Sequence, residues 1–118
     1  MGVLQTCLPG RTGRPPFHVY LGSGGAPEGV LAAAGLQALG GSMIGRLLFR
    51  DEAERGRAEA VGVRDLNRVY SLDDLASSEA SLVMAGVTEQ VLAGVEDRRV
   101  EVLTITPETG QSRAFITV

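Results

Sequence analysis

The sequence has no lysine and no tryptophan, and it has only one cysteine and one histidine among 118 residues. Aromatic residues make up 4% of the chain, so a core has to be built mainly from alanine, valine and leucine. The basic residues are all arginines, and the formal net charge is −3. This charge argues against a nucleic-acid partner, which needs a basic face to neutralise phosphates. Arginine binds phosphates well, but the bias extends to alanine and glycine and is explained by a GC-rich genome.

The single cysteine, Cys7, cannot form a disulfide within the chain, which fits a reducing cytoplasm. With one histidine available to activate it, we expect an inert thiol. No apolar run approaches the roughly 20 residues of a membrane span, and no signal peptide is visible. The sequence therefore predicts a soluble, cytoplasmic protein without a membrane partner, and it leaves open whether the chain forms a homo-oligomer.

The chain reads as a single domain, 1–118, with a linker-like loop at 9–16 that is rich in glycine, proline and arginine. Alternating and buried apolar patterns predict strands at 17–21, 43–50 and 81–87, an extended piece at 69–70 and a terminal hairpin of 100–106 and 111–118. Capping and proline signals predict helices at 26–39, 51–60 and 71–75, and a turn at 88–94. Strands that alternate with helices predict an α/β fold, with a layered mixed β-sheet and flanking helices.

The expected core follows from this periodicity. Its members are apolar residues of the predicted strands and of the first helix, which we expect to be buried on most faces: Val19, Leu21, Val30, Leu31, Ala34, Leu47, Phe49, Leu82, Met84 and Ile105.

The most informative segment is the glycine-rich turn Gly22–Gly29, which precedes the predicted helix. Glycines let a ligand approach the backbone, and a helix N-terminus offers unpaired N–H groups to an anion. The segment lacks the Gly-Lys-Ser/Thr of a P-loop, and Pro27 replaces the third glycine of the dinucleotide fingerprint.

Glu28 is unexpected there, because a carboxylate repels a phosphate. A divalent cation between the two would reconcile them, since Mg²⁺ binds carboxylates together with phosphate oxygens. The alternative is that Glu28 only complements the helix dipole. Three other residues are expected to have structural roles. We interpret His18 as a packed or hydrogen-bonded strand residue, and Asp73 and Asp74 as capping acids in the first turn of a short helix.

Five runs of the sequence resemble class II fructose-1,6-bisphosphatase, the bacterial GlpX-type family of sugar bisphosphatases. They are Tyr-Leu-Gly-Ser-Gly-Gly-Ala-Pro-Glu-Gly-Val-Leu-Ala-Ala-Ala at 20–34, Leu-Gly-Gly at 39–41, Gly-Arg-Leu-Leu-Phe-Arg at 45–50, Val-Tyr-Ser-Leu-Asp-Asp-Leu at 69–75 and Gly-Val-Thr at 86–88. The resemblance implies the C-terminal part of a carbohydrate phosphatase of the inositol monophosphatase type. It also implies Mn²⁺- or Mg²⁺-dependent hydrolysis of the 1-phosphate of fructose 1,6-bisphosphate, and in some relatives of sedoheptulose 1,7-bisphosphate, in gluconeogenesis.

By the same resemblance, Glu28 is a metal ligand and Gly25 contacts the substrate. No catalytic residue of the family falls in this chain, and no stretch matches the other metal-binding carboxylates, which belong to the N-terminal part. At 84–90 the chain also departs from the family pattern. We therefore expect a phosphatase segment that works with a missing N-terminal half. The alternatives are a non-catalytic domain that binds a phosphorylated metabolite and an inactive remnant.

Overall fold

The structure is a computed structural model that describes residues 18–88 and 92–118. The linker-like loop at 9–16, Cys7, Phe17 and part of the predicted turn at 88–94 lie outside these residues. Strands β1 (Ile44–Arg46) and β2 (Val69–Ser71) form a small antiparallel ribbon. Strands β3 (Leu82–Ala85), β4 (Arg99–Thr106) and β5 (Gly110–Thr117) form a second antiparallel sheet in the order β3-β4-β5.

The helices and strands bear out the α/β class, but the expected single mixed sheet is wrong for the described residues. They form two sheets, and every pairing in them is antiparallel. The strand predicted at 17–21 is also wrong over its described part, because residues 18–21 are irregular. Parallel neighbours need a helical crossover between two strands of one sheet. Because residues 18–25 form no strand, the described part of the chain supplies no strand before the helix at 26–38 to complete such a unit.

That helix, α2 (Ala26–Ala38), confirms the prediction closely. It ends at glycine, where the N–H groups of Gly40 and Gly41 donate to the carbonyls of Gln37 and Leu36, at 3.3 and 2.8 Å. This is the Schellman pattern, and Gly40 has the positive φ of 72° that it requires. However, only Ala32, Ala33 and Gly35 of α2 are buried. The helix therefore packs one face of small residues, rather than most faces as expected.

Two shorter helices begin at the predicted caps. In α3 (Glu52–Ala60) the Asp51 carboxylate accepts from the Glu54 N–H at 2.8 Å. The Glu54 carboxylate returns to the N–H of Arg50 instead of Asp51, so the expected capping box is displaced by one residue. In α4 (Leu72–Leu75) the box is complete, with Ser71 as the N-cap and Asp74 as its partner.

The core lies between α2 and the inner face of the three-stranded sheet. Leu82, Leu92, Leu103 and Ile105 form one buried cluster, with Ala38, Leu39 and Met84 packed against it. Leu82 and Ile105 confirm the prediction. Ala34, Leu47, Phe49 and Met84 are half-buried, whereas Val19, Leu21, Val30 and Leu31 are exposed. The core prediction is wrong for these last four residues. Residues 18–21 form no strand, and α2 turns only its small residues to the sheet.

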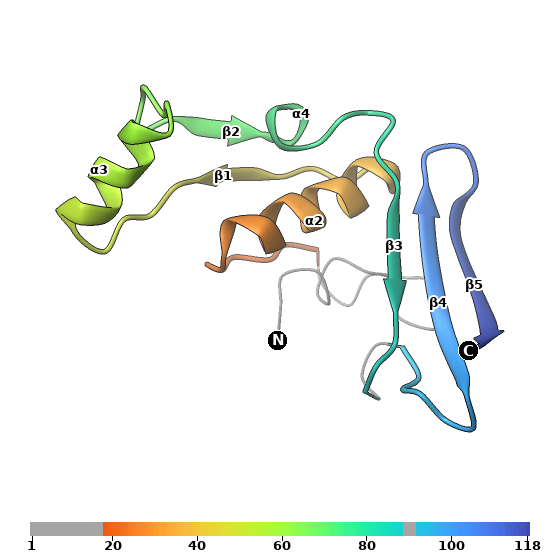
Figure 1. The fold of residues 1–118 in the computed structure, drawn as a ribbon. Helices are drawn as coiled ribbons and strands as arrows, with labels where there is room; N and C mark the ends of the chain where they lie inside the picture. Colours follow the sequence, from red (N-terminus) through yellow and green to blue (C-terminus); the bar gives the residue numbers. More distant parts are fainter. Residues whose placement is uncertain (1–17, 89–91) are drawn as a thin grey trace.

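The arrangement is elongated (Figure 1). The ribbon of β1 and β2 with α3 extends to one side of α2, and the three-stranded sheet stands on the other. The radius of gyration is 16.2 Å, compared with about 13 Å for a compact domain of 100 residues. In the described part of the chain, no helix is long and apolar enough to cross a membrane.

Candidate functional site

The glycine-rich turn leads directly into α2, as the sequence indicates. Gly25 is the N-cap residue, with φ −65° and ψ 150°, and its carbonyl accepts the N–H of Gly29 at 3.1 Å. Pro27 lies in the first turn and sets the entry of the helix. Upstream, the Tyr20 ring lies against Gly22, where a Cβ atom would come within 2.7 Å of the Tyr20 Cζ. This turn is thus held by a close aromatic contact and by the start of the helix.

Gly25 and Glu28 are in direct contact. Glu28 is exposed, and its side chain curls back over the N-cap so that its carboxylate occupies the space that a Cβ atom at Gly25 would need. Only glycine leaves this space open. The two residues that the resemblance selects therefore form one small constellation at the end of α2.

The N-terminus of α2 has no side-chain cap. Pro27 has no N–H, so Ala26 and Glu28 carry the first unbonded N–H groups of the helix. The positive end of the helix dipole and these N–H groups favour an anion. The turn therefore offers two kinds of chemistry side by side, namely donors for an oxyanion and one carboxylate for a cation.

The fit of a divalent cation to this site is partial. Mg²⁺ is commonly held by one or two carboxylates, with water and substrate phosphate oxygens completing the octahedron. Glu28 can supply one such ligand from an exposed position. Across residues 18–88 and 92–118, no group of three or more His, Cys, Asp or Glu side chains is placed to hold a metal ion. These residues thus suit a single ligand in a larger coordination set.

The other candidate residues take different roles. His18 is exposed and lies outside any strand, so the prediction of a packed strand histidine is wrong. Asp74 confirms the capping role: its carboxylate accepts the N–H and the hydroxyl of Ser71 at 2.8 and 2.9 Å, and it pairs with Arg68 at 2.5 Å. The Ser71 N–H, the Ser71 hydroxyl and Arg68 hold the pKa of Asp74 below its ordinary value.

Asp73 links two elements instead of acting as a cap. Its carboxylate accepts the side-chain amide of Gln37 at 3.1 Å, so α4 is tied to the last turn of α2. Gln37 is the polar residue of an otherwise apolar stretch of helix, and this contact accounts for it.

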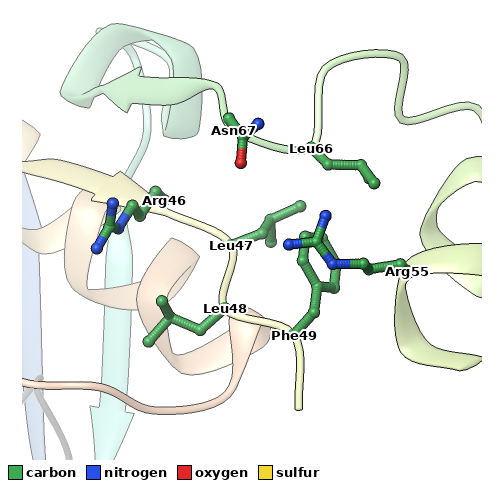
Figure 2. A pocket seen from close by; sticks show the side chains of 7 residues that line it. All are labelled: Arg46, Leu47, Leu48, Phe49, Arg55, Leu66 and Asn67. Carbon is green, nitrogen blue, oxygen red and sulfur yellow. The ribbon is translucent and has the colours of Figure 1, made fainter. Parts of the chain in front are cut away.

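A shallow hollow of about 200 Å³ opens on the ribbon side (Figure 2). The Arg55 guanidinium lies over the Phe49 ring, 5.4 Å from its centroid, while Arg46 points away from it. The hollow is smaller than the 300–1,000 Å³ of typical ligand pockets. Neither Gly25 nor Glu28 lines it.

The sequence analysis missed Glu101, a buried acid on β4 that is 4% exposed. Its carboxylate accepts the N–H of Ala93 at 2.5 Å and pairs with Arg113 of β5 at 3.2 Å. The sequence does contain a signal for this buried acid, because Glu101, Leu103 and Ile105 are every second residue and lie on the inner face of β4. A charged residue in a buried period-two position predicts a buried partner.

The fold and the glycine-rich turn define an α/β protein that presents free helix N–H groups and one carboxylate together at the N-terminus of α2. The chain belongs to the family described as bacterial fructose-1,6-bisphosphatase, glpX-encoded, which it matches over residues 1–116. This confirms the resemblance drawn from the glycine-rich turn.

Curated relatives agree with the family. The chain is 32% identical to a D-fructose 1,6-bisphosphatase class 2/sedoheptulose 1,7-bisphosphatase of Trichormus variabilis, over 86% of this chain and 35% of the relative. It is 42% identical to fructose-1,6-bisphosphatase 2 class 2 of Escherichia coli, over 62% of this chain and 27% of that enzyme. The chain thus spans about a third of the length of the curated relatives it matches.

Proposed function

We propose that this chain supplies one part of the active site of a class II fructose-1,6-bisphosphatase, a phosphoric monoester hydrolase. The substrate is fructose 1,6-bisphosphate, hydrolysed at the 1-phosphate, and the names of several relatives extend the proposal to sedoheptulose 1,7-bisphosphate. The reaction belongs to gluconeogenesis and takes place in the cytoplasm. The domain adopts the C-terminal half of the carbohydrate phosphatase fold.

One observation carries this proposal: Gly25 leaves open the space beside the carboxylate of Glu28, at a helix N-terminus that no side chain caps. In this arrangement the N–H groups of Ala26 and Glu28 orient a phosphate oxygen. The Glu28 carboxylate contributes one ligand to Mn²⁺ or Mg²⁺, which when bound neutralises charge that develops on the phosphate. Gly25 lets the sugar phosphate approach the backbone.

The test places this chain in a complete enzyme. A chimera in which the chain replaces the matching 27% of the Escherichia coli relative is assayed with fructose 1,6-bisphosphate over a range of Mn²⁺ concentrations. We expect Glu28→Gln to raise the Mn²⁺ concentration needed for half-maximal activity and to lower kcat by about 100-fold or more, the usual size when a group that serves the transition state is lost. Glu79→Gln, in an exposed loop, is the control and should leave both unchanged.

A second candidate is a domain that binds a phosphorylated metabolite without hydrolysing it. The free N–H groups at the start of α2 favour it, since they suffice for an anion without a metal. Titration calorimetry of the 118-residue chain with fructose 1,6-bisphosphate separates the two. Binding that is unchanged by Glu28→Gln, together with Mn²⁺ curves of the chimera that are also unchanged, would support the binding domain and reject the metal ligand.

A further inference from the structure

The Glu28 carboxylate lies at the point where α2 is open to an anion. Glu28 is the third residue of α2 and is exposed. One of its carboxylate oxygens occupies the space that a Cβ atom at Gly25 would need. The unbonded N–H groups of Ala26 and Glu28 lie in the same first turn. An oxyanion that approaches these donors therefore meets a negative charge that is already in place.

The acids at the same position of the other two helices have a different role. Glu54 in α3 and Asp74 in α4 also lie three residues after the N-cap, and each accepts a backbone N–H at 2.8 Å. Each also forms an ion pair with an arginine, Arg50 or Arg68. Glu28 forms no side-chain hydrogen bond and no ion pair with another described residue. Within this part of the chain, its charge therefore has no partner to offset it.

The end of the helix acts in the same way on the carboxylate and on a phosphate, and the two oppose each other. The positive end of α2 attracts Glu28 and favours its place beside Gly25. A bare phosphate is attracted to the same N–H groups, but the carboxylate repels it. This repulsion is strong because the two charges would lie within one turn of helix. The turn is therefore poorly suited to a free oxyanion, although its N–H groups are open.

We propose that Glu28 makes the glycine-rich turn selective for a phosphate that arrives with a divalent cation, and that it excludes the bare oxyanion. Selectivity of this kind rests on the proposed function, in which Glu28 is a metal ligand and the N–H groups of Ala26 and Glu28 receive a phosphate oxygen. With a cation bound, Glu28 is one of its ligands and no longer opposes the phosphate, because Mg²⁺ accepts carboxylate and phosphate oxygens in one coordination shell.

The two ligands are then coupled through one side chain. The cation should raise the affinity for phosphate, and phosphate should raise the affinity for the cation by the same factor. Glu28→Gln should have two effects of opposite sign. It removes the repulsion, so the metal-free chain binds phosphate more tightly, and it removes the carboxylate ligand, so the cation no longer helps. A residue that only complements the helix dipole would give no cation effect in the wild-type chain.

The test follows the amide signals of Gly25 and Ala26 in the 118-residue chain by NMR during titration with inorganic phosphate. Mg²⁺ is the added cation, because it is diamagnetic and leaves these signals visible. We expect Mg²⁺ to lower the wild-type dissociation constant for phosphate by about fivefold or more. Without Mg²⁺, Glu28→Gln should bind phosphate about fivefold or more tightly than wild type. Addition of Mg²⁺ should leave the dissociation constant of this variant unchanged.

Glu52→Gln is the matched control. It removes a charge of the same sign from the first turn of α3, whose N-terminus is already capped by Asp51. Its affinity for phosphate should equal that of wild type, both with and without Mg²⁺. The comparison separates the role of Glu28 from a change in net charge. Loss of the Mg²⁺ effect in Glu28→Gln separates it from the complex that Mg²⁺ forms with phosphate in solution.

Three results would overturn the selectivity: a metal-free Glu28→Gln variant that binds phosphate no more tightly than wild type, an equal effect of Mg²⁺ on both proteins, or no shift at Gly25 and Ala26 in any protein. The Mn²⁺ dependence of the chimera is a separate readout. If Glu28→Gln changes that dependence but the phosphate titration shows no reversal, Glu28 is a metal ligand without selectivity. If that dependence is unchanged, the proposed function itself is wrong, and the selectivity with it.

Discussion

Glycine and glutamate act as a pair at the start of α2. The Glu28 carboxylate rests where a side chain at Gly25 would stand, so the position of the acid depends on the absence of a Cβ atom three residues before it. The backbone at Gly25, with φ −65°, is open to any residue. The requirement for glycine is therefore one of space beside the carboxylate, and not of backbone conformation.

Gly25→Ala tests this dependence. We expect the far end of the Glu28 side chain to move away at little cost, with a loss of stability below about 1 kcal/mol from the poorer N-cap. In the chimera, kcat/KM should fall by more than this small loss of stability can explain. Urea denaturation of the chain and kcat/KM of the chimera are the two measurements. If activity is retained, the space beside Glu28 has no role in catalysis.

Asp74 gives a second prediction at the scale of one residue. Because the pKa of Asp74 is lowered in the folded chain, its contribution to stability is present above its ordinary value of 3.8 and is lost as the pH falls through the folded pKa. Asp74→Asn should therefore destabilise the chain near neutral pH, and the difference from wild type should shrink in acid. Denaturation across pH 2–7 checks this. A difference that is constant with pH would show that the carboxylate charge does not matter.

The elements show what can be predicted from local signals. The ends of α2, α3 and α4 follow glycine and capping patterns that act within four residues, so they are visible in the sequence. Residues 17–21 have the alternation that predicts a strand, but the described residues 18–21 form none, because strand pairing is decided by residues distant in the sequence. Glycine-rich sequence identified the candidate site for the same local reason, whereas the Glu101–Arg113 pair depends on the register of β4 and β5.

Two glycines, one just after the end of α2 and one inside α3, separate the effect of backbone conformation from that of side-chain contact. Gly40 has a positive φ and Gly56 lies inside α3, and neither would bring a new Cβ atom within 4 Å of a neighbour. Gly40→Ala should cost about 1 kcal/mol, since alanine is strained in the left-handed region. Gly56→Ala should stabilise the chain by about 0.5–1 kcal/mol. Thermal unfolding of both variants checks this, and equal effects of the same sign would contradict the Schellman assignment.

The whole molecule is less compact than its length suggests. Large apolar side chains such as Leu21, Ile44 and Val83 are at least 63% exposed, and the ribbon of β1 and β2 extends away from the sheet (Figure 1). The relatives are about three times as long as the matched segment. An extended arrangement with exposed apolar surface is what one segment of a larger phosphatase would present, with further protein needed to cover it.

The last prediction concerns catalysis by this chain alone. Metal-assisted hydrolysis of a phosphate ester needs several carboxylates that orient water and hold one or two cations. Glu28 supplies one, and the described residues hold no cluster that could supply the rest. We expect the purified 118-residue chain to show no turnover of fructose 1,6-bisphosphate with Mn²⁺, whereas the chimera with the Escherichia coli relative turns it over. The chimera carrying Glu28→Gln serves as the control for contaminating phosphatase. Turnover by the isolated chain that is lost in its own Glu28→Gln variant would show that it builds a complete site by itself, and the proposed division of the active site would be wrong.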